Sequence, residues 1–404
     1  MTNVLATCSI VAKESLPILA NMLSFASMVN RDWEDVFTEN MSRGYAPGQT
    51  INIKKPPRYQ YRAGRVAVPQ ATTQTTVPLT VQQGGNDLNF TSLERTLSLT
   101  KLEDIIQAAL EPIVNEIDRQ GLQLARYATY NTIGTPGTLP NTQATALAAV
   151  TGVNQRLDEM GAPRKDKRRG FIMNPALNAA AVQGFAGLFN GQEKISEQFG
   201  TGLMVPSLGI AYGMDQNVDL HTNGTAVVGT NTVNGAGQTG STITVNALNG
   251  TVTRGSKITF ANVFAVNPQS RVSTGTLAQF TVTADAANGA TSLQISPAIT
   301  PSGAFQNVTT SPANAATITI FGTASGSYNA NVAFHKDAFT LAMVPMWAPP
   351  GGKGVIDVAQ ETYKGFTIKV TEFYDGVNDN SIMRMDVLFG WAATYPELSV
   401  LYAT

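Results

Sequence analysis

Two pairs of carboxylates in this sequence have the residue types that acid–base or metal chemistry uses. Glu103 and Asp104 are adjacent, and Asp379 and Asp386 follow one another near the C-terminus. No histidine stands near either pair, and surface carboxylates in the first turn of a helix normally cap the helix and interact with its dipole. We therefore predict that both pairs are structural.

Other motifs that carry chemistry are incomplete. The segment GGKG at 351–354 lacks the GxxxxGK[ST] spacing of a phosphate-binding loop, and no helical pattern follows it. No GxSxG motif is present, and neither His221 nor His335 has a nucleophile beside it. The single Cys8 excludes a disulfide within the chain, and two histidines do not supply a Cys/His zinc cluster. We expect no enzyme activity, catalytic residue, cofactor or metal site.

The strongest charged motif is a basic run, RKDKRR, at residues 164–169. Such a run can contact phosphate groups or an acidic partner, here another subunit or DNA. It can equally be a solvated loop in front of a buried strand, and both interpretations stay open. The basic residues concerned are Arg164, Lys165, Lys167, Arg168 and Arg169.

Composition indicates a protein whose surface is occupied by partners. Only 14% of the 404 residues are charged, and the net charge is −1; an average soluble protein has about 25% charged residues. A near-zero charge argues against a dedicated nucleic-acid binder, which shows a basic face. The N-terminus lacks the features of a signal peptide, and no apolar stretch is long enough to span a membrane. We expect a protein made in a reducing cytoplasm.

The first hundred residues change from a helical to an extended pattern. Ile18, Met22, Phe25 and Val29 fall at helical spacing within residues 9–40. An amphipathic core helix is favoured there over an arm that reaches a neighbouring molecule.

Residues 48–100 then show the two-residue period of strands. Pro56 and Pro57 interrupt the first run, and the runs 77–83 and 88–100 alternate again. This pattern predicts an extended β-hairpin with a polar tip, which needs another surface to lie against.

The clearest helix lies within residues 102–133. Pro112 falls inside it, so we predict a short helix, a break, and then a long helix with Pro112 as its first residue. A second helix at 145–161 and a strand at 171–175 follow, and Asn174 with Pro175 should open a third helix. The apolar stripe of the long helix is Ile106, Leu110, Ile113, Ile117, Leu124 and Ala128.

Residues 223–331 form an island of different composition, with only four charged residues: Arg254, Lys257, Arg271 and Asp285. Five segments alternate apolar and polar residues and are separated by Asn-Gly turns, which predicts a small β-barrel or sandwich. Strands return at 365–375 and 381–403, so the island interrupts one domain. Its predicted core is Ile243, Val245, Ile258, Phe260, Phe280, Val282, Leu293, Ile295, Ile318 and Ile320.

The order of these elements resembles that of the major capsid proteins of tailed bacteriophages. The similarity is greatest to coat proteins of short-tailed phages that carry an inserted β-barrel domain. GQTINIKKPPRYQYRAG resembles the start of that family's extended loop, and LEPIVNEIDRQGLQLARYA resembles its spine helix. VTRGSKITFANVF is similar to the core hairpin of the inserted domain, and RMDVLFGWAATYPEL to the C-terminal strand.

The resemblance implies an α+β tailed-phage capsid fold of the Hong Kong ninety-seven type with an inserted all-β barrel. Its parts are an N-terminal helical arm, an extended β-hairpin loop, the spine helix with the peripheral and axial core, the inserted barrel, and a return to the core. The corresponding ranges are 1–40, 41–100, 101–221, 222–331 and 332–404.

The resemblance further implies a structural subunit of an icosahedral phage head. Copies would form hexamers and pentamers around a scaffolding protein, with a portal protein at one vertex and double-stranded DNA packaged non-specifically inside. The protein would belong to the virion, assemble in the bacterial cytoplasm and meet no membrane. The residues leave two other classes open: a secreted polysaccharide-binding β-rich adhesin, which should carry an export signal, and a hydrolase, which should carry a clustered nucleophile and base.

Overall fold

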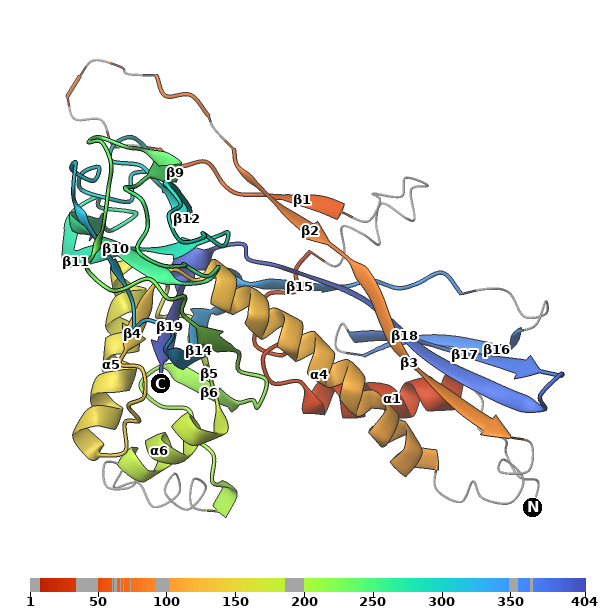
Figure 1. Cartoon of the computed structure of the whole chain (residues 1–404). Coiled ribbons are helices and arrows are strands. Elements are labelled where there is room, and N and C mark those ends of the chain that lie inside the picture. The colour runs from red at the N-terminus through yellow and green to blue at the C-terminus, as the bar shows by residue number, and fades with distance from the viewer. Residues whose placement is uncertain are drawn as a thin grey trace. The chain divides into compact units, whose positions relative to one another are not determined.

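The chain has an α+β fold that divides into two compact units (Figure 1). The computed structural model describes residues 8–33, 50–59, 61, 64–65, 67, 69–72, 74–91, 102–185, 200–348, 355–363 and 366–404. The first unit comprises Met1–Ile53, Val77–Gly121 and Thr340–Ala392. The second comprises Lys54–Thr76, Leu122–Phe339 and Ala393–Thr404.

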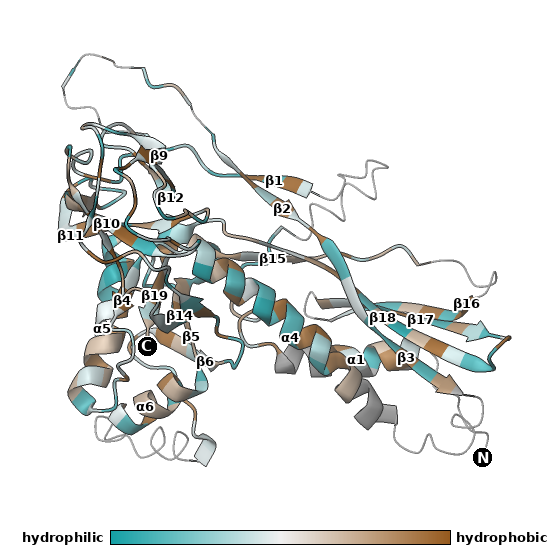
Figure 2. Ribbon diagram, in the orientation of Figure 1, coloured by the Kyte–Doolittle hydropathy of each residue, from teal (hydrophilic) through white to brown (hydrophobic). Residues whose placement is uncertain are grey.

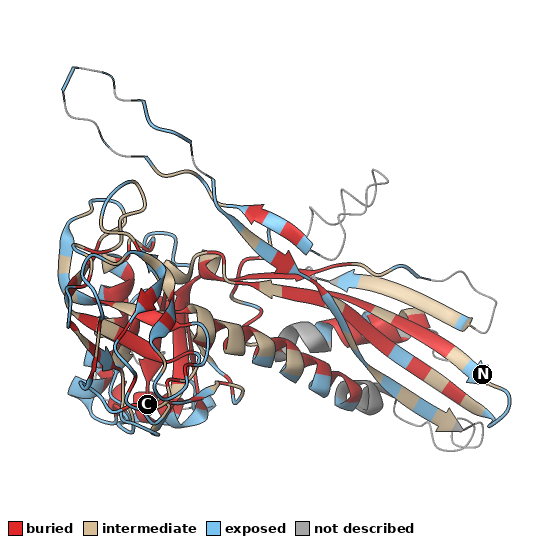
Figure 3. Cartoon of the chain, turned by 45° about the horizontal axis from the view of Figure 1, so that its top comes forward, coloured by how far each residue is buried: buried red, intermediate tan, exposed pale blue. Residues whose placement is uncertain are grey.

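The first unit is built on a five-stranded sheet. Its path is β15-β18-β17-β16, and β3 pairs with β18 beside β15. The central strands β17 and β18 carry mostly buried side chains (Figure 3), as expected from their apolar sequences. β16 was not predicted. The bounds are β3 (Gln82–Thr91), β15 (Thr340–Met343), β16 (Val355–Tyr363), β17 (Phe366–Asp375) and β18 (Asn380–Ala392).

The helix α1 (Cys8–Met22) packs against β16 and β17 with Val11 and Leu16 buried, which agrees with the core-helix interpretation. It ends before Phe25, although the apolar spacing predicted a continuation. The cause is Asp118, whose carboxylate accepts hydrogen bonds from the backbone N–H groups of Ser24, Phe25 and Ala26 at 2.8, 3.3 and 2.9 Å. These bonds hold a turn in place of another helical turn.

The predicted hairpin is present as β1 (Thr50–Lys54) paired with β2 (Thr76–Thr80). The backbone N–H of Lys55 donates to the carbonyl of Thr75 at 2.8 Å and closes the stem. The chain then continues into β3, which leaves the hairpin to pair with β18 along ten residue positions. Residues 92–101, which include most of the strand predicted at 88–100, lie outside the described residues.

The long helix α4 (Leu102–Ala128) is continuous, so the predicted break before Pro112 was wrong. Pro112 cannot donate to the carbonyl of residue 108 and normally disturbs a helix. Here Ala108 and Pro112 both face outward, so the freed carbonyl can be hydrated. The opposite side carries buried Leu110, Ile113 and Ile117, and Figure 2 shows the alternation of brown and teal along α4. Burial of this stripe stabilises the helix through the proline.

The second unit contains a six-stranded sheet of mixed direction, in the order β4-β19-β14-β5-β6 with β7 paired to β14. Asn174 caps the helix α6, because its side-chain oxygen accepts from the N–H of Leu177 at 2.9 Å, as predicted. The strands are β4 (Thr132–Gly134), β5 (Arg169–Met173), β6 (Ile210–Met214), β7 (Leu220–Thr222), β14 (Ser327–His335) and β19 (Ser399–Ala403). The helices are α5 (Gln143–Glu159), α6 (Pro175–Phe185), η1 (Lys336–Ala338) and η2 (Pro396–Leu398).

The low-charge island, here called the β-module (residues 222–331), carries a second six-stranded sheet, drawn in green to cyan in Figure 1. Its order is β8-β13-β10-β11-β12-β9, and a bridge between Val233 and Val245 joins the two outer strands. All ten predicted core residues are buried in one cluster. The strands are β8 (Asn231–Thr232), β9 (Gly240–Thr244), β10 (Lys257–Val266), β11 (Ser273–Val282), β12 (Ser292–Ile299) and β13 (Thr317–Ile320).

Candidate functional site

The basic run forms an exposed loop between α5 and β5. Arg164, Lys165, Lys167 and Arg168 are exposed. Arg164 forms an ion pair with Asp158 at 3.1 Å. Lys167 adopts a left-handed backbone conformation with φ 56°, which turns the chain back toward the strand. Four cationic side chains therefore project from one short loop.

A buried histidine holds this loop in place. His335 Nε2 lies 2.7 Å from Asp166 Oδ2, and the histidine is almost fully buried. Partial burial alone would raise the pKa of Asp166, but the hydrogen bonds from His335 and from the N–H of Arg168 lower it. Asp166 therefore stays ionised, and its two hydrogen bonds fix the conformation of the loop.

Strand pairing adds a cation that the sequence analysis missed. β5 and β14 are antiparallel with His335 opposite Arg169, and the N–H of Lys336 donates to the carbonyl of Arg168 at 2.9 Å. The main chain of Lys336 thus lies beside the basic loop although it is far away in sequence. The only sequence signal was a lysine at the end of a strand, which is uninformative without the register.

Arg169 differs from the rest of the run because it is buried within the subunit. Its Nε donates to the carbonyl of Pro163 at 3.0 Å, and its Nη1 to Asn154 Oδ1 at 2.9 Å. Its Nη2 donates to the carbonyl of Ala162 at 2.7 Å and to Asp158 Oδ1 at 2.5 Å. A guanidinium with these partners fixes the loop from inside, so Arg169 leaves the set of candidate contact residues.

The β-module meets the rest of its unit through buried polar groups, among them Lys257 at the start of β10. Its Nζ donates to the carbonyls of Arg126 and Thr129 at 2.8 and 2.5 Å and to Thr281 Oγ1 at 2.7 Å. Burial, together with the charge of Arg126, lowers the pKa of Lys257. The last carbonyls of α4 lack partners within the helix, and Lys257 supplies a donor for them from the module.

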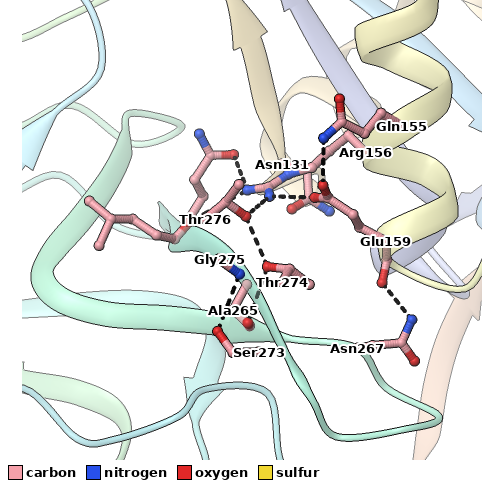
Figure 4. A network of polar contacts seen from close by, with 12 residues as sticks. Asn131, Gln155, Arg156, Glu159, Ala265, Asn267, Ser273, Thr274, Gly275 and Thr276 are labelled. Carbon is pink, nitrogen blue, oxygen red and sulfur yellow. Dashed lines mark hydrogen bonds and ion pairs between the residues drawn. The ribbon is translucent and has the colours of Figure 1, made fainter.

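Arg156 of α5 makes the second connection (Figure 4). Its Nη1 bonds Glu159 at 3.1 Å and also contacts Thr276 Oγ1 of β11. Its Nη2 donates to Gln279 Oε1 at 3.3 Å. In the same region Asn267 donates to the carbonyl of Glu159 at 2.8 Å. The C-terminal turns of α5 therefore hold the β10–β11 hairpin through bonds in which a side chain donates to a side-chain or backbone oxygen.

Gln279 of β11 covers the outer edge of the core sheet. Its Oε1 accepts from the N–H of Thr132 at 2.7 Å, and its Nε2 donates to the carbonyl of Thr132 at 2.8 Å. An unpaired strand edge is a template for association with another chain. The amide of Gln279 takes the place of a further strand at this position of β4.

Arg126 and His221 complete the junction. Arg126 pairs with Asp219 at 2.6 Å and contacts His221 Nδ1 at 3.1 Å. His221 Nε2 lies 3.2 Å from Asn223 Oδ1. Burial, with the charges of Arg126 and Lys257, lowers the pKa of His221 to about 4, so the imidazole is neutral at neutral pH and serves as a hydrogen-bonding group.

Of the carboxylates considered for chemistry, Asp379 and Asp386 are described, and each has other partners. Asp386 lies within β18 and pairs with Lys369 at 3.4 Å and Arg384 at 2.9 Å. Asp379 lies in the turn before β18, where it accepts from the hydroxyl of Tyr374 at 2.8 Å. The side chains of residues 103–104 and the whole of 351–354 lie outside the described residues.

The one cysteine is likewise unsuited to chemistry. Burial and the nearby carboxylates of Asp357 and Glu372 raise the pKa of Cys8 to about 12, and a thiol in that state is a weak nucleophile. Over the described part of the chain, no three His, Cys, Asp or Glu side chains are grouped to hold a metal ion. None of the helices described is both long and apolar enough to cross a membrane.

The chain is similar to known proteins both in sequence and in fold. The family model described as P22 coat protein, gene protein 5, matches residues 70–401. A chain of Mycobacterium phage Che8 is similar in structure, with a TM-score of 0.50, 12% identity, and coverage of 94% of this chain and 90% of that one. At this identity the likeness shows a shared fold. No curated protein matches the sequence.

Two further solved structures are similar over most of their length. The asymmetric unit of the bacteriophage PhiM1 mature capsid has a TM-score of 0.42 and 10% identity, covering 88% of this chain and 82% of that one. A virus-like particle from Pyrococcus furiosus has a TM-score of 0.43 and 10% identity, covering 97% of each chain.

Proposed function

Because the chain belongs to the P22 coat protein family, we propose that many copies assemble around a scaffolding protein into an icosahedral shell that encloses double-stranded DNA. The protein is a structural subunit of a bacteriophage capsid, and its role is non-enzymatic. It assembles with itself into the shell and belongs to the virion. The observation that carries this conclusion is the family match over residues 70–401, which sets aside the adhesin and hydrolase alternatives.

The finer fold proposed is the Hong Kong ninety-seven type with an inserted β-barrel. Support for an inserted barrel comes from the separate apolar core of the β-module and from the bridge that joins its outer strands. The two ends of the module also leave side by side, because Thr222 pairs with Ser327 across β7 and β14. The domain ranges proposed from the sequence stay as given: 1–40, 41–100, 101–221, 222–331 and 332–404.

The shell itself is proposed to consist of hexamers and pentamers, with a portal protein at one vertex and assembly in the bacterial cytoplasm. A surface with few charges supports this, because it lets many copies approach one another without repulsion. The experiment is expression of the protein with its scaffolding protein, followed by light scattering and electron microscopy. Closed hollow particles are expected. A sharp monomer peak at all concentrations, with and without scaffold, would contradict the proposal.

The exposed basic loop is proposed as a contact to a neighbouring subunit or to packaged DNA. Arg164, Lys165, Lys167 and Arg168 carry it, and the main chain of Lys336 lies beside Arg168. Asp158 pairs with Arg164, and Asp166 accepts from His335 and from the N–H of Arg168, so two carboxylates offset part of the charge of the four cations. A cluster of exposed cations suits phosphate contacts that carry no sequence information.

The test replaces Arg164, Lys165 and Arg168 by serine together. Fewer or emptier particles are expected, with unchanged helix content of the free subunit. A fall in DNA content at normal particle number indicates a DNA contact, and a fall in particle number indicates a subunit contact. Arg119→Ser, on the exposed side of α4, is the control for loss of surface charge. Virions as numerous and as full as wild type would reduce the loop to a solvated turn.

A further inference from the structure

The segment Lys55–Tyr59, sequence KPPRY, does not stand free at the start of the hairpin connection. It belongs to the second unit and lies against two other parts of that unit. One is the C-terminal turn around η2, with Tyr395 and Glu397. The other is a pair of β-module loops that contain Arg271, Ala304 and Phe305.

The contact with the C-terminal turn is ionic and aromatic. Arg58 Nη2 lies 2.7 Å from Glu397 Oε1, and both side chains are partly buried, at 37% and 18% exposed. The ammonium of Lys55 lies over the ring of Tyr395, 5.0 Å from its centroid. Pro56 and Pro57 between these two cations restrict the backbone to an extended form. The segment therefore presents both cations in a fixed spacing to one acidic, aromatic turn.

The β-module holds the other side of the segment. Arg271 Nη2 donates to the carbonyl of Tyr59 at 3.1 Å and to the carbonyl of Ala304 at 3.2 Å. Phe305 lies under the guanidinium of Arg58 at 5.8 Å. Arg271 thus bridges the hairpin connection and a module loop with one guanidinium nitrogen.

The packing beneath the segment is open. A cavity of about 630 Å³ lies below it, lined among others by Lys55, Arg58, Tyr130, Gln279, Phe305 and Tyr395. The segment is therefore held by a few polar and cation–π contacts rather than by a packed core, which is the kind of contact that opens and closes.

The end of the segment and the chain just beyond it carry exposed tyrosines. Tyr59 is 52% and Tyr61 93% exposed. Tyrosines are enriched where protein surfaces meet, because they combine a large apolar area with a hydroxyl group. A segment that is held by few contacts and is followed by exposed tyrosines can leave its own subunit and bind another surface.

We propose that Lys55–Tyr59 and its groove, formed by Tyr395, Glu397, Phe305 and Arg271, act as an assembly latch. The hairpin connection is held on its own subunit before assembly, and it is released when subunits join. This inference rests on the proposed function, since a latch on assembly requires copies of the chain that join into a shell. The occupant of the groove is the protein's own KPPRY segment.

The experiment reverses the ion pair in three variants: Arg58→Glu, Glu397→Arg, and both together. Trypsin cleavage after Arg65 of the unassembled subunit reports release of the segment, and light scattering gives the lowest concentration at which particles form. Arg119→Glu is the matched control, because Arg119 and Glu116 form an ion pair of the same 2.7 Å on α4. Arg58→Gln and Glu397→Gln replace the charge reversals if those do not fold.

Each single reversal is expected to be cleaved roughly tenfold faster, the population shift that about 1.4 kcal/mol produces. Each should also form particles at lower concentration than wild type, because the latch no longer competes with assembly. The double reversal restores the ion pair and should return both measurements toward wild type. The control should change neither.

Three outcomes would overturn the latch. Unchanged cleavage would show that the ion pair does not hold the segment. Faster cleavage with unchanged or weaker assembly would show that release does not limit assembly. The two single variants are also mixed. If the mixture assembles like wild type while neither variant does so alone, the groove takes the segment of a neighbouring subunit. Failure of the wild-type protein to form shells would instead contradict the proposed function, while the cleavage comparison still reports on the latch.

Discussion

The interior of the β-module and its junction with the rest of the unit are held by opposite kinds of interaction. The interior is apolar, with Phe260 and Phe280 packed at a ring-centroid distance of 5.4 Å amid aliphatic side chains. The junction is polar, with Lys257, Arg156 and Gln279 reaching backbone and side-chain oxygens across the boundary. The apolar interactions of the interior are non-directional, whereas the polar interactions of the junction depend on hydrogen-bond geometry.

This difference explains how the β-module can be a separate folding unit and still keep one orientation relative to α4 and α5. Apolar burial contributes free energy roughly in proportion to area and tolerates small displacements. Buried polar groups contribute little net stability when satisfied, but they cost free energy when a partner is displaced. The interior therefore stabilises the module, and the junction specifies where it sits against α4 and α5.

The largest effect is expected in the interior. Phe260→Ala removes a fully buried ring that packs on Phe280, and large core truncations of this kind cost about 3–5 kcal/mol. Urea unfolding of the purified subunit measures the loss. Val272→Ala is the control on the same hairpin, because Val272 is 65% exposed and its loss should be small. Equal losses from both changes would mean that the interior does not stabilise the module.

A smaller effect is expected at the junction. Lys257→Met keeps the aliphatic stem but removes the donor for the carbonyl of Arg126, while Thr129 keeps a bond from Thr281 at 3.0 Å. Leaving a buried acceptor unpaired costs about 1–3 kcal/mol. Hydrogen exchange should show lost protection in the last turn of α4. Lys167→Met, at an exposed lysine, is the control, and unchanged protection in Lys257→Met would disprove the capping role.

The interior was predictable from sequence, and the junction was not. Alternation places Ile243 and Val245 on one face because successive strand residues point to opposite sides, and this needs no knowledge of distant residues. The partners of Lys257 are Arg126 and Thr129, whose positions follow only from the packing of β10 against α4. A lysine in an alternating strand pattern gives no sign of this role.

The same limit explains the other differences between sequence and structure. Pro112 predicted a break because local rules disfavour an internal proline, and burial of the opposite face of α4 outweighed them. Arg169 looked like its basic neighbours, and only the fold directs it inward. The main chain of Lys336 lies beside the basic loop through strand register, which a single sequence does not contain.

The junction should also make the subunit sensitive to mild acid through His221. Its pKa in the folded protein is about 4, below the ordinary 6.5, because it is buried beside Arg126 and Lys257. Between these values the unfolded chain binds a proton that the folded chain does not, so stability falls as the pH is lowered through this window. At about pH 5.5 the expected loss is about 1.2 kcal/mol relative to neutral pH.

The measurement is urea unfolding of wild type and His221→Gln at about pH 7 and about pH 5.5. Glutamine keeps a donor and an acceptor but has no proton to gain, so the variant should lose less stability on acidification. The difference between the two proteins isolates the imidazole from other titrating groups. An identical loss in both would show that His221 does not titrate between the folded and unfolded states.

The smallest effect on the β-module is expected from removing the junction altogether. Residues 222–332, expressed alone, should fold, because their ten predicted core side chains are all buried within one cluster and each large apolar side chain contributes about 1.5–3 kcal/mol on burial. The ends of this fragment are already adjacent, since the N–H of Asn223 donates to the carbonyl of Gly326 at 2.9 Å. The loss of Arg156 and the α4 carbonyls then exposes Lys257 and Gln279 to water, which satisfies both. Dispersed amide proton signals and a cooperative melt are expected, whereas collapsed signals and a featureless melt would show that the junction, and not the interior, holds the module together.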